Sequence, residues 1–81
     1  MTYAQLLQKL KKLGMGQVSR MTSDGYDIAR IGRPSEVVFP YAFVSYPVIL
    51  DNGMETEIDD EIIDAILRRF GETREKLDPP N

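Results

Sequence analysis

Residues 15–31, MGQVSRMTSDGYDIARI, contain the signal that decides the fold, a tight turn between two segments of mixed apolar and polar residues. The pair Asp24-Gly25 is typical of a two-residue β-turn, because both central positions of that turn need positive φ. The sequence therefore predicts a β-hairpin with strands at 15–22 and 26–31.

The register of this hairpin is left open by the sequence. Pairing outward from the turn places Met21 opposite Ile28 and Val18 opposite Ile31. These two apolar pairs lie on opposite faces of a regular hairpin, because side chains alternate along a strand. Either the register differs or a β-bulge interrupts it.

An amphipathic helix is predicted before the hairpin, over about residues 3–13. Thr2 and Gln5 have the spacing of a capping box, and leucines at 6, 7, 10 and 13 form one apolar stripe. Gly14 is placed to end this helix in a left-handed conformation.

Residues 36–50 are rich in β-branched and aromatic side chains, a composition that favours strands. Pro40 and Pro47 cannot donate to a sheet ladder, so we expect one or two strands with a kink or an edge position at a proline. After a turn at 51–53, the alternation over 54–58 predicts a further short strand with one solvent-facing side.

A second amphipathic helix is predicted over about residues 59–70. Apolar residues recur at helical spacing, acidic residues occupy the first turn, and Arg68 and Arg69 occupy the last. Gly71 is a natural stop, and the segment 72–81 offers only one large apolar side chain to bury.

These elements predict the α+β class, with two helices packed on one face of a small three- to four-stranded antiparallel sheet in the order α-β-β-β(-β)-α. We expect a single domain over residues 1–71, followed by a flexible C-terminal tail over residues 72–81.

Composition excludes several classes of chemistry. The chain has 81 residues, with no His and no Cys. It therefore has no thiol nucleophile, no imidazole general base and no ordinary zinc site, and no glycine-rich phosphate loop is present. We expect a protein that is not an enzyme and that holds no cofactor or metal. No secretory signal or membrane-spanning run is found, so we expect a soluble cytoplasmic protein of bacterial or phage origin.

Charge is distributed unevenly along the chain, with a net charge of +4 over residues 1–34 and −7 over residues 35–81. The first part offers a candidate nucleic-acid patch, in which cations bind phosphates and aromatic rings stack on bases. The residues of this patch are Lys9, Lys11, Lys12, Arg20, Arg30 and Arg33. The simpler interpretation is a mixed, solvated surface.

Two features are candidates for binding a protein partner. An aromatic, proline-interrupted segment over residues 39–47 contains Tyr41, Phe43 and Tyr46, which form either an interface or part of the core. An acidic stretch follows, either as a face for a basic partner or as helix capping and the wet side of a strand. Its candidate partner-binding residues are Glu55, Glu57, Asp60 and Asp64.

The predicted element order resembles that of double-stranded RNA-binding domains and of the small HicA-type toxin ribonucleases, as does the length. The HicA-type toxins use a histidine in the strand region, and this chain has none. Double-stranded RNA-binding domains have lysines at the start of the second helix, where this chain has Asp59, Asp60 and Glu61, which repel phosphate. No function is carried over from either family.

The sequence favours a small interaction or regulatory protein without enzymatic activity, which binds another protein through the aromatic segment or the acidic helix. Self-association as a homodimer through a proline-containing edge strand is a variant of this hypothesis. The alternative is nucleic-acid binding, in particular RNA binding, through the basic residues of the N-terminal part.

Overall fold

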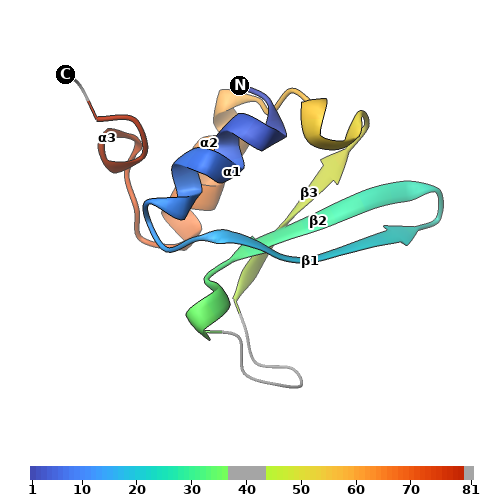
Figure 1. Cartoon of the computed structure of the whole chain (residues 1–81), viewed down its shortest axis with the longest axis horizontal. Helices are drawn as coiled ribbons and strands as arrows, with labels where there is room; N and C mark the ends of the chain where they lie inside the picture. The colour runs from blue at the N-terminus through green and yellow to red at the C-terminus, as the bar shows by residue number, and fades with distance from the viewer. Residues whose placement is uncertain (37–43, 80–81) are drawn as a thin grey trace.

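The computed structural model describes residues 1–36 and 44–79 of the chain (Figure 1). The elements along the chain are α1 (Tyr3–Lys11), β1 (Gly16–Ser23), β2 (Tyr26–Gly32), the 3-10 helix η1 (Pro34–Glu36), β3 (Ser45–Leu50), the 3-10 helix η2 (Gly53–Glu55), α2 (Asp60–Arg69) and α3 (Arg74–Leu77). The strands form one antiparallel sheet in the order β1-β2-β3. The predicted α+β class with an antiparallel sheet is thus confirmed. No fourth strand lies within the described ranges.

The turn between β1 and β2 has the predicted geometry. Asp24 and Gly25 have φ values of 53° and 82°, and Ser23 pairs with Tyr26 directly across the turn. Positive φ at both central positions matches the right-handed twist of the two strands, which is why this dipeptide closes the hairpin. The predicted β-hairpin is confirmed.

A β-bulge settles the register that the sequence left open. The pairing shifts between Gln17 and Ser19, so that Gln17 faces Ile31 and Val18 is the extra residue. Because one residue is inserted, side chains on the far side of the bulge point to the opposite face from the one that regular alternation would give. The two apolar pairs suggested by the sequence are therefore not both formed.

The helix α1 begins as predicted and ends two residues early, at Lys11. The Thr2 side chain accepts a hydrogen bond from the Gln5 backbone, and the Gln5 side chain accepts one from the Thr2 backbone, which completes the capping box. Gly14 has a φ of 70°, which ends the turn that follows the helix.

The predicted short strand over residues 54–58 is wrong. Residues Gly53–Glu55 form η2, and the only sheet-like contact that the structure describes there is an isolated bridge between Thr2 and Glu57. The cause is local, because the buried Thr56 hydroxyl accepts from the Asn52 backbone at 2.9 Å and donates to the Gly53 carbonyl at 2.8 Å. These bonds hold the chain in a turn rather than in an extended strand.

Pro47 lies in β3, which is an edge strand of the sheet. An edge strand tolerates proline, because one of its sides has no ladder partner that needs the missing N–H. The expectation of an edge position for this proline is confirmed. Pro40 lies outside the described residues.

One hydrophobic core joins the helices to one face of the sheet. Alternate residues of β2 and β3 face the core, while their neighbours face the other way. In Figure 1, α1 and α2 lie on the same side of the sheet. The main core residues are Tyr3, Leu6 and Leu10 of α1, Ala29 and Ile31 of β2, Val48 and Leu50 of β3, Ile63, Ile66 and Leu67 of α2, and Leu77 of α3.

The segment after α2 includes the short helix α3, whose N-cap Thr73 accepts a hydrogen bond from the Lys76 backbone. Leu77 is buried in the core, and the Asp78 carboxylate lies 2.8 Å from the Lys9 ammonium. The hydrogen bond from Lys9 holds the pKa of Asp78 below its usual value. These contacts favour a docked α3, and the division into a domain over 1–71 and a flexible tail over 72–81 stays a prediction.

Gly32 is predicted to be intolerant of a side chain. A Cβ at this position would lie 2.9 Å from the Val44 carbonyl oxygen and 3.4 Å from the Val18 methyl groups. We expect Gly32→Ala to lower the free energy of unfolding by about 1–3 kcal/mol, because the backbone of residue 44 must move. Gly16 pairs with Gly32 on the neighbouring strand and has open space around it, so Gly16→Ala is the matched control. Urea unfolding of both variants is the measurement, and equal losses would contradict the expected clash.

Candidate interaction surface

The side of the sheet that faces away from the core has an apolar row across all three strands. Met21 of β1 pairs with Ile28 of β2, and Ile28 pairs with Ile49 of β3. Tyr26 and Pro47 flank this row on the same side, as the alternation along β2 and β3 requires. We call these five residues, Met21, Tyr26, Ile28, Pro47 and Ile49, the open-face patch. The side chains of Met21, Tyr26 and Ile49 are 54%, 58% and 59% exposed.

The opposite side of the same hairpin is polar near the turn. Arg20 donates two hydrogen bonds to the Asp27 carboxylate, at 3.0 Å and 2.6 Å, and Thr22 lies beside them. These hydrogen bonds hold the pKa of Asp27 below its usual value and raise the pKa of Arg20.

Near its turn, the hairpin therefore shows the reverse of the usual pattern. A strand with one solvated face normally turns apolar residues toward its own core and polar residues toward water. Here the polar residues lie on the helix side, and Met21, Ile28 and Ile49 lie on the side away from the core. Burial among residues 1–36 and 44–79 does not account for Met21 and Ile49, each of which is more than half exposed.

The aromatic segment proposed from the sequence is only partly described. Tyr41 and Phe43 lie outside the described residues. Tyr46 pairs with Ile31 on the core side of the sheet, where it is half-buried and packs against the core. Its position is the one expected of a core residue.

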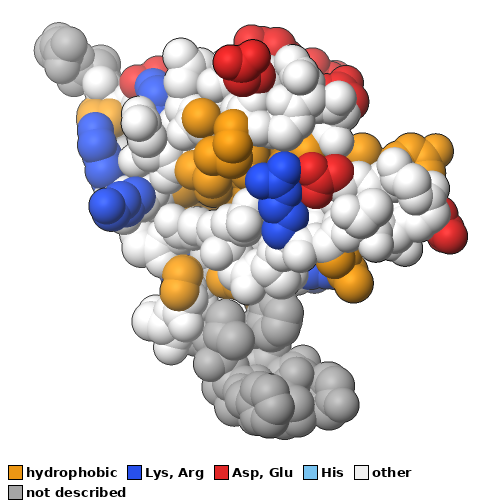
Figure 2. Space-filling model, turned by 45° about the vertical axis from the view of Figure 1, so that its right-hand side comes forward, with side chains coloured by type: hydrophobic (Ala, Val, Ile, Leu, Met, Phe, Trp, Pro, Cys, Tyr) orange, Lys and Arg blue, Asp and Glu red, His pale blue; other side chains and the backbone are white. Residues whose placement is uncertain are grey.

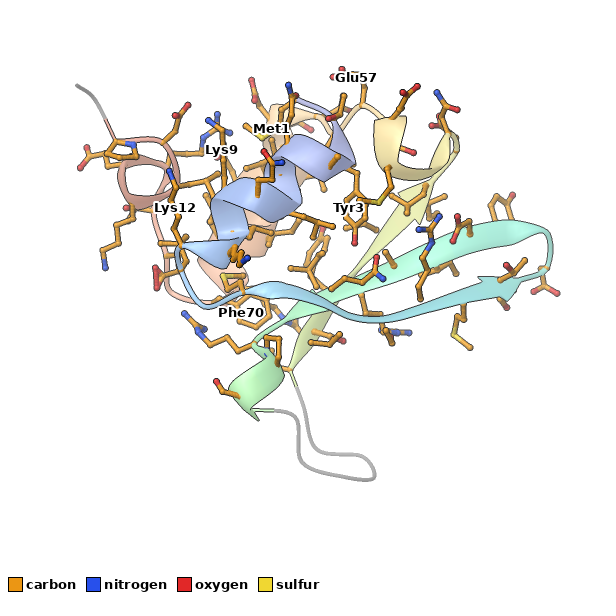
Figure 3. The ribbon with its side chains drawn as sticks, viewed as in Figure 1. Met1, Tyr3, Lys9, Lys12, Glu57 and Phe70 are labelled. Carbon is orange, nitrogen blue, oxygen red and sulfur yellow. The ribbon has the colours of Figure 1, made fainter. Side chains whose placement is uncertain are left out.

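The four acidic candidates lie on and around the start of α2, and Figure 2 shows acidic side chains gathered along the upper edge of the molecule. Glu57 lies 3.3 Å from the N-terminal amine of Met1, and Figure 3 shows these two residues close together. Asp60 and Asp64 lie 3.3 Å and 3.7 Å from Arg74 of α3. Glu55 is exposed in η2. Three of the four candidates thus have a cationic partner within the chain.

The structure does not bring the six basic candidates into one patch. Lys9, Lys11 and Lys12 lie on the C-terminal half of α1 and the residue after it, as the two labelled in Figure 3 illustrate. Arg20 faces the helix side of the sheet because it pairs with the buried Ala29, and Arg30, the next residue after Ala29 in β2, faces the open side. The cationic groups therefore point to different sides of the molecule.

Two of the six basic candidates also form ion pairs with carboxylates of the acidic C-terminal part. Arg33 lies 3.1 Å from Glu72, donates to the Phe70 carbonyl, and stands 5.4 Å from the centroid of the Phe70 ring. Lys9 forms an ion pair with Asp78 at 2.8 Å. The uneven charge along the sequence thus reflects, in part, ion pairs that join the beginning of the chain to its end.

Sequence reasoning missed the open-face patch. The signal that points to it is local, because Met21 and Ile28 are paired by the Asp24-Gly25 turn, while Arg20 and Asp27 lie on the other side. The sequence does not predict where the bulge lies. Without the bulge, the side of the hairpin that faces the helices is ambiguous.

The chain was compared with protein-family models, with curated proteins and with solved structures, and none of them matches. Within residues 1–36 and 44–79, no group of three or more carboxylates is placed to hold a metal ion, and no pocket is found. No helix in that part of the chain is long and apolar enough to cross a bilayer.

Proposed function

We propose that this chain is a non-enzymatic interaction protein that binds another protein chain through the open-face patch. The observation that carries the proposal is the exposure of Met21, Tyr26 and Ile49, each more than half exposed on the side of the sheet away from the core. With their neighbours these side chains form one contiguous apolar patch, and such a patch on a small protein often marks a binding site.

A protein partner fits this surface better than a nucleic acid does. The described part of the open face carries one cation, Arg30, and the chain as a whole has a net charge of −3. Phosphate binding needs several convergent cations, and three of the six candidates are paired with carboxylates of the same chain. We also propose a cytoplasmic location, which agrees with the absence of cysteine.

Photo-cross-linking tests the proposed surface. A benzophenone amino acid placed at position 49 is expected to form a covalent adduct with another protein chain in the cells that produce this protein. The same amino acid at position 8 is the control, because Gln8 is exposed on α1, on the other side of the sheet. Absence of an adduct at position 49, or equal adducts at both positions, would overturn the proposal.

A further inference from the structure

Two residues of β2 flank Ile28 on the open side of the sheet. On the same side of β2, Tyr26 lies two residues toward the turn and Arg30 lies two residues in the other direction. At the rise of an antiparallel strand, each of these residues is about 7 Å from Ile28 along the strand. An aromatic ring and a guanidinium group thus stand at equal distances from the centre of an apolar row.

From this symmetry we infer that the partner is a second copy of this chain, stacked face to face on the open-face patch with the strands of the two copies antiparallel. The inference rests on the proposed function. A twofold axis that crosses the strands at Ile28 places the apolar row of one copy on the same row of the other. It also places Tyr26 of each copy over Arg30 of the other, which forms two cation–π pairs.

Charge distinguishes this arrangement from the other way of stacking two copies. A twofold axis parallel to β2 would also bring Ile28 against Ile28, but it would place the two Arg30 side chains against each other. Like charges inside an interface from which water is excluded repel strongly. The antiparallel arrangement instead gives each guanidinium an aromatic ring, so the patch is complementary to itself in one orientation only.

The small size of the patch indicates a reversible dimer. The patch consists of five side chains on three short strands, and interfaces smaller than the standard size class are typical of transient complexes. Each copy retains its own core, with thirteen buried apolar residues described from α1 to α3. The chain therefore folds as a monomer, and association is expected in the micromolar range of dissociation constants.

Sedimentation equilibrium of the purified full chain is the first test. We expect a monomer–dimer equilibrium, and we expect Ile49→Glu to raise the dissociation constant by roughly 30-fold or more. Ile49 is largely exposed, so the fold should tolerate this substitution, and circular dichroism verifies it. Met21→Glu makes the same change on a different strand, in case β3 is sensitive to substitution.

The matched control is Gln8→Glu, which adds the same charge on the exposed side of α1 and is expected to leave the dissociation constant unchanged. A wild-type chain that stays monomeric at millimolar concentration would overturn the inference. An equal weakening by Gln8→Glu would do so as well, because the effect would then come from net charge.

Arg30→Gln tests the orientation through the sign of its effect. In the antiparallel arrangement the substitution removes two cation–π pairs, and we expect the dissociation constant to rise roughly tenfold. In the parallel arrangement the same substitution removes a repulsion, and the dimer would become tighter. A tighter dimer would therefore overturn the antiparallel arrangement.

The mass of the photo-cross-linked adduct separates this inference from the proposed function. An adduct of twice the chain mass supports the second copy. An adduct with a different protein, together with a monomeric purified chain, would overturn the second copy and would leave the proposed binding surface intact. Failure of both experiments would overturn both.

Discussion

Replacing Leu77 by alanine is expected to lower the free energy of unfolding by about 2–4 kcal/mol. The Leu77 side chain is 1% exposed and belongs to the same core cluster as the leucines of α1. The helix α3 has only four residues, Arg74–Leu77, and a helix of that length does not hold itself together in water. Its position therefore depends on tertiary contacts, of which Leu77 is the buried one.

Urea unfolding followed by circular dichroism measures this loss. Lys76→Ala is the control, because Lys76 is the exposed neighbour in the same short helix and its removal should change the free energy by less than about 0.5 kcal/mol. Equal small losses for both variants would show that residues 72–81 behave as the flexible tail that the sequence predicts. A large loss for Leu77→Ala alone would place α3 in the folded domain.

The parts of the fold that the sequence predicts correctly depend on signals confined to a few residues. Each of these signals lies within ten consecutive residues. They are the Asp24-Gly25 turn, the capping box of Thr2 and Gln5, and the apolar stripe of α2. Such signals need no knowledge of distant contacts, because backbone conformation and local hydrogen bonds decide them.

The parts that fail depend on contacts between distant segments or on a single inserted residue. Alternation over residues 54–58 is equally compatible with a strand and with the turn that the Thr56 hydroxyl stabilises. One apolar side chain, Leu77, gives no periodicity, so the sequence does not decide whether residues 72–81 are docked, and the flexible tail stays a prediction. The bulge at Val18 decides which side of the hairpin remains open, and no composition rule places it.

These misses bear directly on the candidate surface. The sequence directs attention to aromatic and acidic residues, because these types are frequent in binding sites. The structure shows that Tyr46 faces the core and that Asp60 and Asp64 lie within 4 Å of Arg74. The exposed apolar side chains on the open side of the sheet include Met21, Tyr26 and Ile49, ordinary strand residues whose significance depends on which side of the sheet the helices cover.

Between pH 10 and 12 the protein is expected to lose about 2–3 kcal/mol of stability through the titration of Tyr3. The Tyr3 ring is fully buried, its hydroxyl donates to the Gln17 side chain at 2.8 Å, and Figure 3 shows it directed from α1 toward the sheet. Burial raises the pKa of Tyr3 from 10.0 to about 12, and the Arg20 guanidinium opposes this only in part. The folded chain therefore retains a proton that the unfolded chain has already lost.

The sign follows from the number of protons that each state binds. Below pH 10 both states keep the Tyr3 proton, so this residue adds no pH dependence there. As the pH rises from 10 toward 12, the unfolded state binds fewer protons than the folded state, and the free energy of unfolding falls by about 1.4 kcal/mol for each pH unit. Above the pKa in the folded state, both forms are ionised and the loss is complete.

Tyr3→Phe removes this titration. We expect the variant to be less stable than the wild type at low pH and more stable at high pH. At pH 8 the variant should be less stable by about 1 kcal/mol, because the hydrogen bond to Gln17 is lost. At pH 12 the variant should be the more stable protein, since it has no buried phenol to ionise. Urea unfolding at a series of pH values gives the difference between the two proteins, in which the titration of other groups cancels.

Gln17→Ala separates burial from hydrogen bonding. This control removes the acceptor of the Tyr3 hydroxyl and leaves the ring in the core, so the loss between pH 10 and 12 should persist. If the loss vanished in Gln17→Ala, the hydrogen bond rather than burial would hold the proton. A constant difference between Tyr3→Phe and the wild type at all pH values would show that the Tyr3 hydroxyl is accessible to water, and α1 would then be packed less tightly on β1 than the structure describes.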